Sequence, residues 1–229
     1  MLGGGGSILT VPVLHYLLGY DVKAAIPMSL VIVALTGAFG AVNHWRAGTV
    51  NWRAALSFGP PAVIGSIFGA DFGLKLDPRI QLLVFALVVL AAAVTMLLPR
   101  PSPHPGVRPA RSLPFITLIG AAVGLITGFV GVGGGFLYVP ALIALGGLAV
   151  KEAIGTSLVL IMLSCIAAVA RYQGNTLMDW RTIVIFCALA FLGVGIGSRL
   201  SSHVPNHVLR RGFAALLFIM GALVLFRGR

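Results

Sequence analysis

Long apolar runs, separated by short polar or glycine-containing stretches, follow one another along the whole chain. Several are roughly 20 residues long, the length that crosses the hydrocarbon core of a bilayer as a helix. These runs lie at residues 24–45, 54–74, 80–98, 113–130, 153–172, 182–200 and 208–226. Two further apolar pieces, at residues 7–19 and 135–147, are too short to span in the same way. The pattern predicts an all-α, polytopic helical membrane protein.

A glycine cluster precedes each of the two half-length pieces, and the two copies match in one register. Residues 3–12 read GGGGSILTVP and residues 131–140 read GVGGGFLYVP. The prolines that end these motifs are 128 residues apart (140 − 12). Further residues coincide at this offset: Ser29 with Ser157, Trp52 with Trp180, and Arg53 with Arg181. Glycines, prolines and a Trp-Arg pair in one register predict an internal duplication.

This register divides the chain into repeat 1 (residues 1–98), a Pro/Arg-rich linker (99–112) and repeat 2 (113–229). The linker holds no acidic residue, so the positive-inside rule predicts that it is cytoplasmic. The counterpart of residues 113–130 would precede Met1, since 113 − 128 is −15. We expect that translation starts further upstream or that repeat 1 lacks its first helix. Loop charges favour inverted over parallel halves.

A glycine-led, half-length segment in each half is typical of the broken or re-entrant helices of transporters. The alternative for residues 7–19 is a helix kinked by Pro12. Irregular backbone survives in hydrocarbon only where protein or a watery cavity satisfies its polar groups. Elsewhere, Gly65, Gly69 and Gly73 recur every four residues, which predicts close backbone packing of two helices.

Composition supports a membrane protein and excludes several other classes. The chain is 59% hydrophobic and 9% charged, against about 25% charged in soluble domains, and its mean hydropathy is +1.04. The net charge of +11 comes from basic residues that lie between the apolar runs, which favours contact with a membrane surface over binding of nucleic acid. Cys165 and Cys187 are isolated within apolar runs, and the histidines are scattered. We therefore expect no metal, no cofactor and no enzymatic activity.

The glycine motifs are the candidate binding site for a small anion. Glycines leave backbone N–H groups open to approach, and a helix that begins after them carries about half a positive charge. Hydroxyl groups and one arginine can add donors. Helix capping or packing is the alternative for the hydroxyl groups, and an interfacial position is the alternative for the arginine. The candidate substrate-binding residues are Gly3, Gly5, Gly6, Pro12, Ser29, Gly131, Gly133, Gly134, Gly135, Pro140, Thr156, Ser157 and Arg171.

Two further expectations concern single residues. Asp71 is the one carboxylate near the interior of a predicted span, which makes it the candidate for proton coupling, and a surface pairing with Lys75 is the alternative. Valine at Gly134 is expected to block a ligand while leaving the fold largely intact.

The doubled Gly-x-Gly-Gly-x-x-x-x-Val-Pro-x-Leu motif, with an Ala-x-x-x-Ser-Leu start to each following helix, resembles the sulfite exporter TauE/SafE family of membrane transporters. The resemblance implies a multi-pass permease of the bacterial inner membrane that exports sulfite, sulfonates or related organic anions. Its implied partners are the small anion and the lipid bilayer, and a homo-oligomer is compatible with it. An accessory or channel-like subunit without coupled transport is the alternative.

Overall fold

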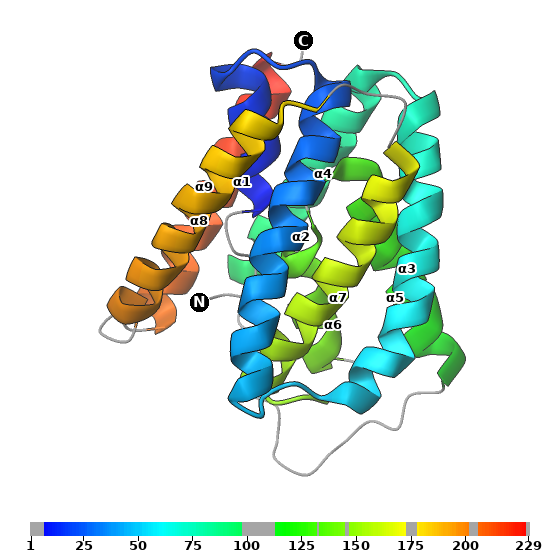
Figure 1. Ribbon diagram of the computed structural model, residues 1–229, viewed down its shortest axis with the longest axis vertical. Helices are drawn as coiled ribbons and strands as arrows, with labels where there is room; N and C mark the ends of the chain where they lie inside the picture. Colours follow the sequence, from blue (N-terminus) through cyan, green and yellow to red (C-terminus); the bar gives the residue numbers. More distant parts are fainter. Residues whose placement is uncertain are drawn as a thin grey trace.

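The computed structural model describes residues 7–97, 113–131, 133–144, 147–172, 178–201 and 206–227. Within these ranges the chain is helical and contains no strand (Figure 1). The elements are α1 (Ser7–Pro12), η1 (Val13–Leu17), α2 (Val22–Arg46), α3 (Trp52–Lys75), α4 (Pro78–Leu97), α5 (Leu113–Val130), α6 (Gly135–Ala144), α7 (Val150–Tyr172), α8 (Trp180–Ser201) and α9 (Asn206–Arg227). The all-α prediction is confirmed for this part of the chain.

Polar residues at the ends of the apolar runs fix where several helices begin. The Asn51 side chain accepts a hydrogen bond from the Ala54 N–H, 3.1 Å away, at the start of α3. Asp77 and Asp179 accept bonds from backbone N–H groups in the first turns of α4 and α8. Side-chain oxygens at this position satisfy N–H groups that have no partner within the helix.

Four pairs of helices begin at residues that are the same distance apart in the sequence. Subtracting the first residue of each helix from that of its counterpart gives 128 every time: Ser7 and Gly135, Val22 and Val150, Trp52 and Trp180, Pro78 and Asn206. Residues 98–112, which include the linker, lie outside the described residues.

Helices α2 and α7 pack against each other at the centre and run antiparallel (Figure 1). A side chain placed on Gly37 would touch Ile161, one on Gly40 would touch Leu158, and Gly155 lies against Thr49, just beyond α2. Residues later in α2 therefore contact residues earlier in α7, as in an antiparallel pair. Both helices are long and apolar enough to cross a membrane, by length and composition.

Helices α3 and α5 pack in parallel at backbone distance, as the glycine spacing predicted. A Cβ on Gly65 would overlap the backbone carbonyl of Ala121, and a Cβ on Gly69 would overlap that of Leu125. Helix α5 also contributes a glycine to this contact, because Gly124 lies against the backbone carbonyl of Ala62 in α3. Small residues at this spacing let two backbones approach closely, so the prediction of tight packing is confirmed.

The first half-length segment continues through its proline. Pro12 has helical angles (φ −60°, ψ −38°), and the chain widens into the short π-helix η1 directly after it. A π-turn is one way to accommodate the backbone hydrogen bond that proline cannot make. The kinked-helix alternative therefore describes this segment better than a break at Pro12. The second segment, α6, ends at Ala144, before the predicted end at 147.

The helix ends define two faces, which we call the upper and lower faces as they lie in Figure 1. At the upper face the Lys23 ammonium donates to the carbonyls of Gly73 and Leu74, so α2 begins where α3 ends. At the lower face the Asn51 N–H donates to the Thr156 hydroxyl, so α3 begins near the start of α7. Helix α5, parallel to α3, therefore rises from the lower face.

Candidate functional site

The glycine turn between α5 and α6 lies at mid-depth in the bundle. A Cβ on Gly133 would meet Val33 of α2 and Ile161 of α7. Each of these residues is 11 positions from the start of its helix (33 − 22 and 161 − 150), or about 16 Å at 1.5 Å per residue. Because α2 and α7 are antiparallel, the two depths are measured from opposite faces. The turn therefore sits near the middle of both long helices.

The backbone of this turn requires glycine. Gly131, Gly133 and Gly134 have φ values of +75°, +71° and +62°, a left-handed conformation that side chains disfavour. A Cβ at Gly131 would also press on Ile26. At Gly134 it would overlap the Thr127 hydroxyl. The expectation that valine at Gly134 leaves the fold largely intact is therefore wrong, because that position is packed against protein.

Hydrogen bonds fix the turn through its carbonyls. The buried Ser29 hydroxyl donates to the Gly131 carbonyl over 2.8 Å, and the Gly131 N–H donates to the Thr127 carbonyl over 3.0 Å. The Gly134 carbonyl accepts from the N–H groups of Leu137 and Tyr138. Between described residues, no hydrogen bond engages the N–H groups of Gly133, Gly134 or Gly135. The start of α6 thus holds three buried backbone N–H groups at mid-depth that have no partner among the described residues.

Of the hydroxyl residues predicted for the site, the structure places one at the turn. Ser29 binds Gly131, as described above. The Ser157 hydroxyl instead donates to the Ile154 carbonyl within its own helix, over 2.8 Å. The Thr156 hydroxyl accepts from the Asn51 N–H over 2.9 Å, near the lower face. Both are fully buried and serve local structure in this conformation.

The remaining predicted residues lie in three places. Arg171 is at the upper face, where its guanidinium pairs with Asp71 at 2.7 Å and its side chain is 52% exposed. The ion-pair partner of Asp71 is thus Arg171, whereas the surface alternative predicted Lys75. Pro140 lies within α6 and Pro12 at the end of α1. Helix α6 packs against α7 and α1 against α2. Gly3, Gly5 and Gly6 fall outside the described residues.

Sequence reasoning missed a set of buried hydroxyl groups beside the turn. Tyr138, fully buried in the first turns of α6, shares a 2.8 Å hydrogen bond with Ser164 of α7. Thr127, in the last turns of α5, is 1% exposed and donates to the Val123 carbonyl. A tyrosine three positions after Gly135, in a segment too short to span, was the available signal. Thr127 and Tyr138 both lie next to Gly134, so these hydroxyl residues adjoin the turn.

Charged groups lie at the faces rather than at the turn. Asp179, beside α8 at the upper face, accepts from the Tyr20 hydroxyl at 2.5 Å and the Thr182 hydroxyl at 2.8 Å. The Tyr20 bond and then the Thr182 bonds lower the pKa of this carboxyl to about 2. Within the described residues no cluster of His, Cys, Asp or Glu is suited to a metal ion. The turn offers backbone dipoles in place of ionised side chains.

Known proteins match the chain over nearly its full length. The sequence profile described as Sulfite exporter TauE/SafE matches residues 1–224. A probable membrane transporter protein of Xylella fastidiosa (strain 9a5c) is 31% identical over 233 residues, covering 99% of this chain and 89% of that protein. Another, from Haemophilus influenzae, is 28% identical over 240 residues, with 96% and 90% covered. No solved structure matches the chain significantly.

The resemblance seen in the repeated glycine motifs is therefore confirmed, and with it the membrane setting that composition predicted. The profile covers both motifs, and the relatives are named as probable membrane transporters. The chain belongs to the sulfite exporter TauE/SafE family and is a helical membrane transporter protein.

Proposed function

We propose that this protein is a secondary transporter that exports small anions, such as sulfite, sulfonates or related organic anions, across the bacterial inner membrane. The family's description supports the substrate class and direction. The observation that carries the proposal is the start of α6, where the amides of Gly133, Gly134 and Gly135 are not engaged by any described residue. A helix start at membrane mid-depth is where transporters of broken-helix design bind anionic groups.

The chemistry of the turn favours an oxyanion. About half a positive charge at a helix start attracts a negative ligand, and the N–H groups at that start can donate to its oxygens. A fixed cation in mid-span would cost at least about 2.5 kcal/mol on insertion scales. No described residue supplies such a cation: the described arginines and lysines lie at or near helix ends. Backbone donors avoid this cost and suit an ion that must also be released.

An inverted duplication would provide two related half-sites and alternating access. The common offset of 128 in the helix starts supports the division into repeats 1–98 and 113–229. The antiparallel course of α2 and its counterpart α7 supports inversion of the halves, which the loop charges also favoured. In inverted-repeat transporters, substrate sites lie near the midplane between the repeats and are exposed alternately to each side. The mid-depth glycine turn fits that location.

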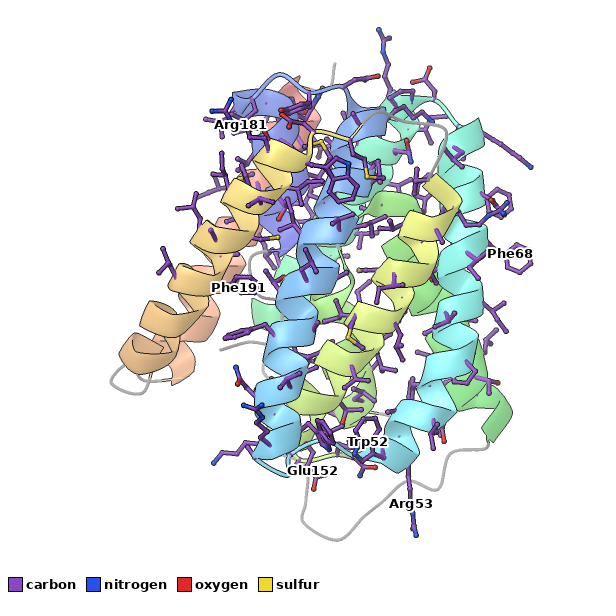
Figure 2. The ribbon with its side chains drawn as sticks, in the orientation of Figure 1. Trp52, Arg53, Phe68, Glu152, Arg181 and Phe191 are labelled. Atoms are coloured by element: carbon purple, nitrogen blue, oxygen red, sulfur yellow. The ribbon has the colours of Figure 1, made fainter. Side chains whose placement is uncertain are left out.

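Charge distribution supports a cytoplasmic lower face. Figure 2 shows Arg53 and Glu152 at the lower end of the bundle and Arg181 at the upper end. The linker that joins α4 to α5 contributes Arg100, Arg108 and Arg111. Four of the five acidic residues, Asp21, Asp71, Asp77 and Asp179, lie at or next to helix ends of the upper face. With these linker arginines, the loops that join helix ends at the lower face carry more Lys and Arg than those at the upper face, which supports a cytoplasmic lower face by the positive-inside rule.

The proposal is tested by flux. Purified protein in proteoliposomes loaded with labelled sulfite or a simple sulfonate should release the anion faster than protein-free vesicles, and an imposed ion gradient should drive it against its own gradient. Flux that only follows the anion's gradient would favour a channel. Absence of flux for every small sulfur oxyanion tested, with folded protein, would refute the substrate class.

A further inference from the structure

A groove between α4 and α9 carries an inference that is independent of the glycine turn. Its volume is about 610 Å³, within the range of roughly 300–1,000 Å³ that is usual for ligand sites. Its walls are α4 side chains between Arg79 and Leu90 and α9 side chains between Phe218 and Phe226. Apart from Arg79, every lining residue is apolar. The groove therefore suits a hydrocarbon chain better than a small hydrophilic anion.

The groove has the length and position of a lipid tail. From residue 79 to residue 90 the α4 wall extends over 11 residues, or about 16 Å at 1.5 Å per residue. The wall starts at the upper face, where α4 begins, and runs into the apolar part of the bundle. Leu83, Phe218 and Phe226 are 52%, 56% and 84% exposed, so this side of the molecule faces hydrocarbon. One end of the groove is thus at a membrane surface and the rest is at acyl-chain depth.

Arg79 stands at the surface end and is available to bind an anion. The backbone N–H of Arg79 donates to the Asp77 carboxylate over 2.7 Å, which caps the start of α4. The ion pair found among the described residues is Arg171 with Asp71, so the Arg79 guanidinium is not bound to a carboxylate within that part of the chain. Lys23 is near enough to Asp77 to interact with its charge, which offsets the repulsion that Asp77 would exert on an anion.

We propose that this groove binds one acyl chain of an anionic phospholipid, whose phosphate is held by Arg79. An arginine guanidinium matches phosphate geometry through paired hydrogen bonds and is more weakly hydrated than a lysine ammonium. The apolar walls of α4 and α9 contact the chain, while the headgroup stays at the upper surface. Because these helices pack chiefly against each other, the lipid also fills the space between them and supports their pairing.

Native mass spectrometry of the full-length protein, with phosphatidylglycerol and phosphatidylcholine added separately, tests this site. Arg79→Gln removes the charge, and Ala222→Trp fills the groove. The matched controls are Arg53→Gln, an exposed arginine at the lower face, and Ala188→Trp, an exposed alanine on α8. Wild-type protein should retain phosphatidylglycerol preferentially, and Arg79→Gln should weaken that preference about fivefold, as expected for one basic residue near an anionic surface.

Ala222→Trp should reduce retention of both lipids, whereas both controls should behave like wild type. Equal lipid retention by Ala222→Trp and Ala188→Trp would overturn the site. A preference for phosphatidylglycerol that survives Arg79→Gln would overturn the role of Arg79. A dimer that is present in wild type and lost only in Ala222→Trp would show that a second copy of the chain, rather than a lipid, occupies the groove.

Discussion

Replacing Gly135 with proline tests whether backbone amides hold the anion. Gly135 is the first residue of α6, and its φ is not positive, unlike those of Gly131, Gly133 and Gly134. Proline is well tolerated at the first position of a helix, since its fixed φ suits that site. The substitution deletes one of the three N–H groups that have no partner among the described residues. Gly135→Ala keeps the N–H and adds a Cβ, so it is the matched control.

The expected loss follows from the bond that is removed. A hydrogen bond to a charged group contributes about 1.5–3 kcal/mol, and each 1.4 kcal/mol is a tenfold change in affinity. The Kd of the anion should therefore rise by roughly 10- to 150-fold in Gly135→Pro, since the lost bond is made only in the bound state. Gly135→Ala should bind far more tightly than the proline variant.

Equilibrium binding of labelled sulfite to detergent-solubilised protein provides the measurement. Size-exclusion elution and helical circular dichroism, compared with wild type, report whether each variant is folded. If folded Gly135→Pro binds as well as Gly135→Ala, the amides at the start of α6 do not hold the anion. If both variants lose binding equally, the effect is steric and the amide argument fails as well.

Three further predictions concern the packing and the charges. Gly65→Ala should lower the melting temperature strongly because its Cβ would overlap α5. Gly193, 128 positions later, has no atom within 4 Å of an added Cβ, so Gly193→Ala should lower the melting temperature little. Similar melting shifts in the two variants would contradict the packing. The exposed Asp71–Arg171 pair should contribute about 0.2–1 kcal/mol to the free energy of unfolding in a double-mutant cycle. Arg171→Gln should lower transport only modestly. Loss of anion binding in that variant would show that the site is at the upper face. The pKa of Asp179 is lowered from 3.8 to about 2, so its stabilisation is present above pH 3.8 and declines as pH falls toward 2. Thermal melts between pH 5 and 3 should fall less steeply for Asp179→Asn than for wild type, and parallel curves would refute this role.

Local sequence was sufficient to place the helices. The run at residues 113–130 became α5 with the same bounds, and the run at 24–45 became α2, Val22–Arg46. The length of an apolar run and the polar residues that cap it are both local in the sequence. The sequence therefore contains the information that sets where each helix begins and ends. The glycine motif likewise marked the irregular backbone, because a positive φ at Gly133 is a property of one residue.

The tertiary structure decided which groups meet. Ser29 and Ser157 occupy equivalent sequence positions, yet one donates to Gly131 and the other to its own helix. Arg171 pairs with Asp71 across 100 residues of sequence, a contact that no local pattern indicates. Such partners depend on helix crossing and depth, which arise from packing between elements far apart in the chain. The sequence by itself determined the helices, the membrane setting and the glycine turn. Only the packing of α2, α5 and α7 decided that this turn lies at mid-depth, with the Gly131 and Gly134 carbonyls hydrogen-bonded and the N–H groups of Gly133–Gly135 without a partner among the described residues.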